Sequence, residues 1–297
     1  MDVRIELRRS DGASLAMGDG TDWHLPVPDT EGMARLNLTL STSPRVLADG
    51  SALVSKRVDE ADRTVRAEYG GRDNAAARAQ AVAFFNPKHS FEMHVEAMGR
   101  RRWCAGELEA FECPFQHERM ATEFTFTLLC PDPFWRSEDR NEHPFGDASP
   151  MFGFPYVSHA RETLPGDVRR PVGSLASKSV YDGVNTVWNS GDVAAPYLVR
   201  IDALGEIVNP CISKGGKRVC VQATLTAGQT LLIDFEGRMA SVTVDGRNVI
   251  HRCTRDSSFT GMRMGTGPNP FAFSCDNPAN RSLARVSVLF NKRYLGV

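Results

Sequence analysis

The chain has 297 residues, of which 41% are hydrophobic and 24% are charged, and its formal net charge is −1. This length accommodates two domains that each bury a core, and the composition is ordinary for a folded protein. A net charge near zero gives no electrostatic basis for binding nucleic acid or an anionic membrane. The N-terminus lacks the apolar stretch of a secretory signal, and no window approaches the roughly 20 apolar residues of a membrane span. We therefore expect synthesis in a cytoplasm and no membrane insertion.

Several segments of the first half alternate apolar and polar residues with a period of two, which predicts half-buried strands. The apolar positions of these segments are Val3, Ile5 and Leu7, then Leu36, Leu38 and Leu40, then Phe91, Met93 and Val95, and finally Phe124, Phe126 and Leu128. In the third segment, Glu92, His94 and Glu96 are expected to face solvent. Arg100, Arg101 and Arg102 follow it, and this basic run indicates either a solvated turn or a subunit contact.

One segment departs from this rhythm and predicts a helix. Residues 72–87, RDNAAARAQAVAFFNP, offer an N-cap at Asp73 or Asn74, a run of alanines and a stop at Asn86-Pro87. Ala77, Ala81, Phe84 and Phe85 fall at helical spacing. Packed on a sheet, Phe84 and Phe85 are expected to plug one end of a β-barrel or sandwich.

Residues 131–188 are rich in proline and show only brief strand-like pieces. Such long irregular stretches are uncommon inside a compact domain. We therefore predict an N-terminal domain over residues 1–145, an irregular connector over 146–188 and a C-terminal domain over 189–297. In the last of these, alternation resumes in PYLVRIDA, RVCVQATL, TLLIDF, SVTVDGRNV, FAFSC and ARVSVLF. Short strands at this spacing predict an antiparallel sandwich, and the absence of strand–helix alternation argues against an α/β nucleotide-binding fold.

Motifs for catalysis or metal binding are missing from the sequence. There is no P-loop, dinucleotide-binding glycine motif, GxSxG elbow or HExxH. The seven cysteines lack CxxC spacing, and Cys104, Cys113 and His117 match no common zinc pattern. We interpret the cysteines as buried thiols that behave like small hydrophobic residues. Pairs of carboxylates such as Glu107 and Glu109 lie along single strands, which indicates a solvated face rather than a catalytic pair. We expect no enzymatic activity, metal or cofactor.

Taken in order along the chain, a set of segments resembles the distal tail proteins (Dit) of long-tailed, siphovirus-type bacteriophages. In the first half these are the turn at Ala48-Asp49-Gly50, the helix end AVAFFNP, the strands FEMHV and EFTFTLLC, and the closing CPDPFW. In the second half they are NSGDVAAPYLVRI, Asn209-Pro210, the Gly228 turn, DGRNV, SSFTGMRMGTGPNPFAF and the terminal VSVLFNKRYLGV. The two prolines around Asn269 and the proline-rich connector depart from the family pattern.

The resemblance implies a mainly all-β chain with an N-terminal β-barrel-like or sandwich domain that has one α-helix and a C-terminal galectin-like β-sandwich. It implies a homohexameric ring at the distal end of the tail tube. Expected partners are the major tail tube protein, the tail-associated hub protein, the tape-measure protein and receptor-binding or side-fibre proteins. DNA would pass through the central channel at genome ejection. In this interpretation CPDPFW ends a strand, because Pro131 and Pro133 supply no N–H to a ladder, and Phe134 with Trp135 docks the exiting chain.

A ring of head-to-tail contacts needs two different complementary surfaces on each subunit, and exposed strands can continue a sheet into a neighbour. The hypothesis assigns the ring interface to the first strand and to the segment between Leu36 and Tyr69. Its residues are Val3, Ile5, Leu7, Leu36, Leu38, Leu40, Val46, Asp49, Gly50, Val65 and Tyr69. The alternative is a host-surface adhesin that binds carbohydrate through the galectin-like domain, with Trp188, Tyr197, Phe259 and Tyr294 as candidate platform residues.

Overall fold

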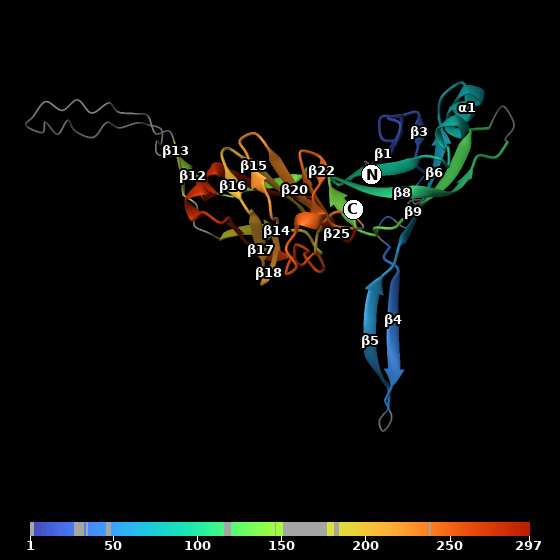
Figure 1. Cartoon of the computed structure of the whole chain (residues 1–297). Helices are drawn as coiled ribbons and strands as arrows, with labels where there is room; N and C mark the ends of the chain where they lie inside the picture. The colour runs from blue at the N-terminus through green and yellow to red at the C-terminus, as the bar shows by residue number, and fades with distance from the viewer. Residues whose placement is uncertain are drawn as a thin grey trace, which may run out of the picture. The chain divides into compact units, whose positions relative to one another are not determined.

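The computed structural model describes residues 3–26, 33, 35–45, 49–115, 120–145, 147–150, 177–180, 184–237 and 239–297 (Figure 1). The chain forms two compact units. The first comprises residues 1–140, 191–193 and 291–297, and the second comprises residues 141–190 and 194–290. Across the described ranges the protein is mainly antiparallel strand with a single α-helix, so the predicted mainly all-β fold is confirmed. No helix in these ranges is long and apolar enough to cross a bilayer.

A nine-stranded antiparallel sheet forms the body of the first unit. Its spatial order is β2, β1, β7, β8, β9, β6 and β3, and a short pair formed by β10 and β25 joins it beside β8. The bounds are β1 (Val3–Arg9), β2 (Ser14–Gly18), β3 (Trp23–His24), β6 (Ala61–Tyr69), β7 (Ser90–Ala97), β8 (Arg100–Glu112), β9 (Glu123–Cys130), β10 (Trp135–Ser137) and β25 (Arg293–Tyr294). Because β2 and β3 lie close together, the sheet nearly closes into a barrel.

Alternation along these strands builds the interior of the barrel. Ile5 and Leu7 on β1, Val65 on β6 and Phe126 on β9 are all 0% exposed. Strand β1 is paired on both sides, since Ile5 lies opposite Met17 of β2 and opposite Val95 of β7. Each large apolar side chain buried in this way contributes about 1.5–3 kcal/mol relative to exposure.

The predicted helix is present as α1 (Asn74–Phe84). Its N-cap is Asp73, whose side chain accepts a hydrogen bond from the Ala76 amide at 2.9 Å. Ala77, Ala81 and Phe84 face inward and are buried. Phe85, directly after the helix, is also buried and packs its ring on four aromatic rings of the sheet, those of Phe91, Phe111, Phe124 and Phe126.

The chain leaves the barrel through the segment after β9. Trp135 is 0% exposed, and its indole N–H donates to the Met33 carbonyl at 2.8 Å. The buried guanidinium of Arg63 lies 4.0 Å from the Trp135 ring and donates to the Pro133 carbonyl at 2.8 Å. Phe134 is half-buried, and Pro131 is exposed just past the last residue of β9. One buried cation and two backbone carbonyls therefore fix the chain around Trp135, where it leaves the barrel.

Two main sheets and one core make up the second unit. The larger sheet has the order β11, β24, β15, β20, β21 and β22, and the smaller has the order β14, β23, β17 and β18. The core between them includes Tyr197, Ile201, Ile233 and Phe271, all 0% exposed. The bounds are β11 (Asn141–Pro144), β14 (Asn185–Asn189), β15 (Leu198–Ala203), β17 (Cys211–Lys214), β18 (Lys217–Cys220), β20 (Thr230–Asp234), β21 (Ser241–Val244), β22 (Arg247–Asn248), β23 (Gly267–Ser274) and β24 (Ala284–Phe290).

Minor elements complete the second unit. They are the strand pairs β12 (Asp147–Pro150) with β13 (Ser177–Val180) and β16 (Ile207–Val208) with β19 (Thr224–Leu225), and the short 3-10 helices η1 (Ile250–Arg252) and η2 (Pro278–Leu283).

Two cysteines differ from the sequence-based interpretation, which treated all seven as free thiols. A disulfide joins Cys211 on β17 to Cys220 on β18, and that interpretation was wrong for these two. The physical reason is the hairpin register, which places Cys211 directly opposite Cys220 across a turn at Gly215 and Gly216. Cys104, Cys130 and Cys275 are buried free thiols, and burial raises the pKa of Cys104 and Cys275.

Candidate assembly surface

A hairpin of the first unit forms a sheet of its own. Strands β4 (Leu38–Pro44) and β5 (Ser51–Val58) pair only with each other, and no strand of the barrel pairs with either (Figure 1). Every described residue from Leu38 to Arg45 is exposed, and Leu38, Leu40 and Leu53 are 57%, 57% and 59% exposed. The alternation around Leu38 and Leu40 predicted a half-buried strand, but nothing in the described part of the chain covers these side chains.

The register of the hairpin sorts its side chains into two faces. Leu38 pairs with Val58, Leu40 with Lys56 and Thr42 with Leu53. Directly opposed residues lie on the same face of an antiparallel pair. A register shift between Ser41 and Thr42 brings Leu53 onto the face of Leu38 and Leu40. Leu38, Leu40, Leu53 and Val58, with the single cation Lys56, form what we call the apolar face.

The residues paired on the opposite face of the hairpin are polar or small. This face carries the pairs Thr39 with Arg57 and Ser41 with Ser55. Asp59 stabilises the hairpin next to the end of β5. Its carboxylate accepts a hydrogen bond from the Thr39 hydroxyl and another, at 2.6 Å, from Arg57. These hydrogen bonds, that of Thr39 first, lower the pKa of Asp59. Val54, 67% exposed, is the unpaired residue at the register shift. A row of exposed large apolar residues such as Leu38, Leu40 and Leu53 is typical of an interaction surface.

The other residues of the predicted ring interface lie in different environments. Ile5, Leu7 and Val65 are 0% exposed, so their side chains serve the core of the barrel and only the backbone or the outer face of their strands is available to a neighbour. Val3, Leu36 and Tyr69 are half-buried, and the Tyr69 ring packs on Trp23 with centroids 5.1 Å apart. Asp49 and Gly50 are exposed, and Val46 lies outside the described residues.

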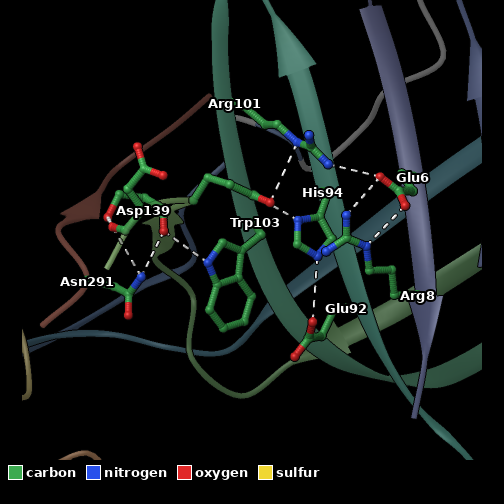
Figure 2. A network of polar contacts seen from close by, with 10 residues as sticks. Glu6, Arg8, Glu92, His94, Arg101, Trp103, Asp139 and Asn291 are labelled. Carbon is green, nitrogen blue, oxygen red and sulfur yellow. Dashed lines mark hydrogen bonds and ion pairs between the residues drawn. The ribbon is translucent and has the colours of Figure 1, made fainter. Parts of the chain in front are cut away.

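A network of charged side chains crosses the outer face of the barrel (Figure 2). His94 on β7 is 5% exposed, and its Nδ1 lies 2.9 Å from a carboxylate oxygen of Glu138. Glu92 reaches the other ring nitrogen at 3.5 Å, and Arg101 contacts both Glu138 and Glu6. A hydrogen bond from Arg8 lowers the pKa of Glu6.

The sequence predicted a solvated face here, and for His94 that prediction was wrong. The segment after β10 lies over this part of the sheet: the indole N–H of Trp103 donates to the Ser137 carbonyl at 3.0 Å, and Asn291 donates to the same oxygen at 2.9 Å (Figure 2). His94 is buried because this later segment covers it. Period-two alternation identifies the face of a residue but not a distant segment that folds onto that face.

The residues of the basic run Arg100–Arg102 differ in how exposed they are. Arg102 is buried, and its guanidinium lies 3.8 Å from the Tyr294 ring and donates to the Gly296 carbonyl. Arg293 pairs with Asp132, and the Leu295 amide donates to Asp192 at 3.1 Å. These contacts hold the C-terminal residues in the first unit, an arrangement that no sequence signal pointed to.

Among the described residues, no group of three or more His, Cys, Asp or Glu side chains is arranged to hold an ion. Of the weak cluster considered from the sequence, Cys104 is buried with its sulfur 3.8 Å from that of Cys130, and Cys113 is half-buried. His117 lies outside the described residues.

The aromatic residues considered for a sugar platform are mostly covered. Tyr197 is 0% exposed, and burial raises its pKa. Phe259 is half-buried against the ring of Phe235, and Tyr294 is half-buried under Arg102. Trp188 on β14 is 59% exposed and lies opposite Pro268 on β23. Trp188 is thus the only residue of this predicted set that offers an open aromatic surface.

Comparison with known proteins found one family model that matches the chain. Residues 190–294 match the model of the siphovirus-type tail component, C-terminal domain. No curated protein matches the chain. Among solved structures, SPP1 Dit, described as a paradigm of the hub adsorption apparatus in phages that infect Gram-positive bacteria, has a TM-score of 0.64 at 12% identity, with 97% of this chain and 98% of that chain covered.

Two baseplate structures of phage P2 are also similar. The structure in the activated conformation with Ca has a TM-score of 0.59 at 10% identity and full coverage of both chains, and the corresponding structure with Sr has a TM-score of 0.55 at 10% identity with 99% of both covered. At these identities the likeness concerns the fold, which extends over both units. Together with the family match, it confirms the resemblance to distal tail proteins that the sequence indicated.

Proposed function

We propose that this chain, a structural component of siphovirus-type phage tails, forms a hexameric ring at the distal end of the tail tube. The observation that carries the proposal is the family match of residues 190–294 to siphovirus-type tail components, joined to a distal tail fold over 97% of the chain. In this role the ring joins the tail tube to the tail-associated hub protein and serves as a platform for receptor-binding components. Its bore is the passage for the tape-measure protein and then for DNA.

The first unit is proposed to close the ring and the second, galectin-like unit to carry peripheral components. The exposed apolar face of the hairpin supports this division, since a lone subunit gains nothing from leaving Leu38, Leu40 and Leu53 in water. A formal net charge of −1 agrees with a protein that lets DNA pass without retaining it.

Immunogold labelling of intact virions tests the location. Antibodies raised against the purified chain are expected to label only the tail end farthest from the capsid. Label distributed along the tube, or confined to the end that joins the capsid, would contradict the proposal. Antibodies against the major tail tube protein, which should label the full tube, are the control for access.

A second candidate function rests on Trp188, whose 59% exposed indole offers a stacking surface on the second unit. Stacking on an exposed aromatic ring is a common way to hold a sugar, and it would make the chain a carbohydrate-binding adhesin. A glycan array probed with wild-type protein and with Trp188→Ala tests it. Binding lost in the variant would support this role, whereas no binding by the wild type would remove it.

A further inference from the structure

Helix α1 has an outward face without charge. Its inward residues Ala77, Ala81 and Phe84 are buried, while Ala79 and Val82 on the other side are exposed, Val82 at 46%. Arg78 is the only charged residue between Asn74 and Phe84. Gln80 is the one exposed polar residue of the helix. A solvent-facing side normally carries more polar residues than this, whereas an apolar side is normally covered.

Large apolar side chains lie beside the helix, next to Arg78 and Asn74. Phe115 is 89% exposed, and the centroid of its ring lies 3.9 Å from the guanidinium carbon of Arg78. Arg78 also donates to the Cys113 carbonyl at 3.2 Å. Met120 is 58% exposed, and its carbonyl accepts from Asn74 of the helix at 3.1 Å. We call the exposed residues Ala79, Val82, Phe115 and Met120 the α1 patch.

We infer that the α1 patch of one subunit receives the apolar face of the hairpin of the next subunit. This inference rests on the proposed ring and adds the identity of the two surfaces that close it. A head-to-tail ring requires two different complementary surfaces on each subunit. The first unit presents two exposed apolar surfaces, one on a lone hairpin and one on a helix, and each supplies the cover that the other lacks.

The two surfaces offer one complementary charge pair, and the cation at the α1 patch, Arg78, lies on the Phe115 ring and donates to the Cys113 carbonyl. The apolar face of the hairpin includes one cation, Lys56, which lies opposite Leu40. At the α1 patch, the exposed carboxylate of Glu112 directly precedes Cys113, whose carbonyl binds Arg78. Charges at the rim of an apolar contact mainly fix its register and orientation. Lys56 of one subunit is therefore placed against Glu112 of its neighbour.

Two charge-inserting variants test the pairing of surfaces. Leu38→Glu/Leu40→Glu blocks the hairpin, and Ala79→Glu/Val82→Glu blocks the patch. The latter keeps good helix formers at exposed positions, so its fold should survive. Each variant alone is expected to lose the ring. Met98→Glu, at an 80% exposed residue in the turn between β7 and β8, is the matched control and should keep it. Circular dichroism and thermal unfolding check that all variants are folded.

The outcomes separate this inference from the proposed function. Rings formed by Ala79→Glu/Val82→Glu but not by Leu38→Glu/Leu40→Glu would overturn the α1 patch and leave the ring itself standing. If wild-type protein forms no ring even in assembled tails, the proposed function fails first. Equimolar mixing of the two blocked variants should restore one productive contact per pair and give a complex of two chains.

Zero-length carbodiimide crosslinking identifies that contact. In the mixture, the amine of Lys56 on the patch-blocked variant should condense with the carboxylate of Glu112 on the hairpin-blocked variant, with loss of one water and formation of an amide. Mass spectrometry detects the linked peptides, and isotope labelling of one variant shows that they come from different chains. Lys56→Arg keeps the charge but removes the reactive amine, so the linked peptides should disappear. If the linked peptides are absent from the mixture that retains Lys56, the inference is wrong.

Discussion

Residues 3–9 and 36–42 carry nearly the same alternation of apolar and polar side chains, yet their apolar residues have opposite environments. Ile5 and Leu7 are 0% exposed, whereas Leu38 and Leu40 are both 57% exposed. Strand β1 is paired on both sides inside a barrel, while among the described strands β4 pairs only with β5. Alternation therefore specifies a strand with two unlike faces, and the surrounding chain decides whether the apolar face is covered within the subunit. In the hairpin no described residue of the subunit covers it.

Truncation of one leucine in each region gives the largest contrast. Leu7→Ala should lower the free energy of unfolding by about 2–5 kcal/mol, because it leaves a cavity in the barrel core. Leu40→Ala should change it by less than about 0.5 kcal/mol, because its side chain makes no core contact. Chemical denaturation of both variants, at a protein concentration at which each is monomeric, measures the difference. Equal losses would show that Leu40 is covered within the subunit.

The hairpins β17–β18 and β4–β5 offer a second contrast, since a disulfide joins the strands of the first and no covalent bond joins those of the second. Cys211→Ser/Cys220→Ser removes a crosslink between residues nine apart, which the chain-entropy model values at about 2–3 kcal/mol. Thermal unfolding in the absence of reductant should therefore show a lower midpoint for the variant. Cys253→Ser, at a half-buried free thiol, is the control. An unchanged midpoint for the double variant would contradict a stabilising disulfide.

The two sides of α1 offer a third contrast. Asp73→Ala removes the N-cap that accepts from the Ala76 amide and should cost about 1 kcal/mol of stability. Val82→Glu on the outer side should leave stability unchanged to within about 0.5 kcal/mol, since the side chain is exposed. Urea titrations of the monomeric proteins compare the two variants. A larger loss for Val82→Glu than for Asp73→Ala would mean that the subunit itself covers the outer side.

The smallest effect concerns the charged network on the barrel. The hydrogen bond from Arg8 depresses the folded-state pKa of Glu6, so this carboxylate adds stability above its unfolded pKa and loses it as pH falls through the folded value. Because the pair is partly exposed and screened, we expect about 0.5 kcal/mol. Glu6→Gln should flatten the acid limb of the stability–pH curve by that amount. A variant curve parallel to wild type would show that the ion pair contributes nothing.

Much of the strand and helix content followed from local pattern. Alternation predicted β1, β7 and β9 with their inward residues, and the cap at Asp73 with the stop at Asn86 predicted α1. These features depend on residues close in sequence, so a single chain reveals them.

The features that were missed depend on distant parts of the chain. Burial of His94 requires residues 137–139 to lie on the sheet, and the return of residues 291–297 to the first unit requires Arg102 and Asp192 to meet them. The Cys211–Cys220 bond follows from a hairpin register that spacing alone did not reveal. The sequence could not predict that Leu38 and Leu40 are exposed, because the alternation of apolar and polar residues is the same whether the apolar face of a strand is covered or not.

The mass of the purified full chain in solution tests the central claim most directly. Light scattering behind size exclusion should give a six-fold multiple of the 32.7 kDa chain, and negative-stain images of the same peak should show annular particles. If the chain is a monomer alone, co-expression with the tail-associated hub protein supplies a template, and the complex should then contain six copies. A monomer that stays at one copy in that complex would contradict the ring.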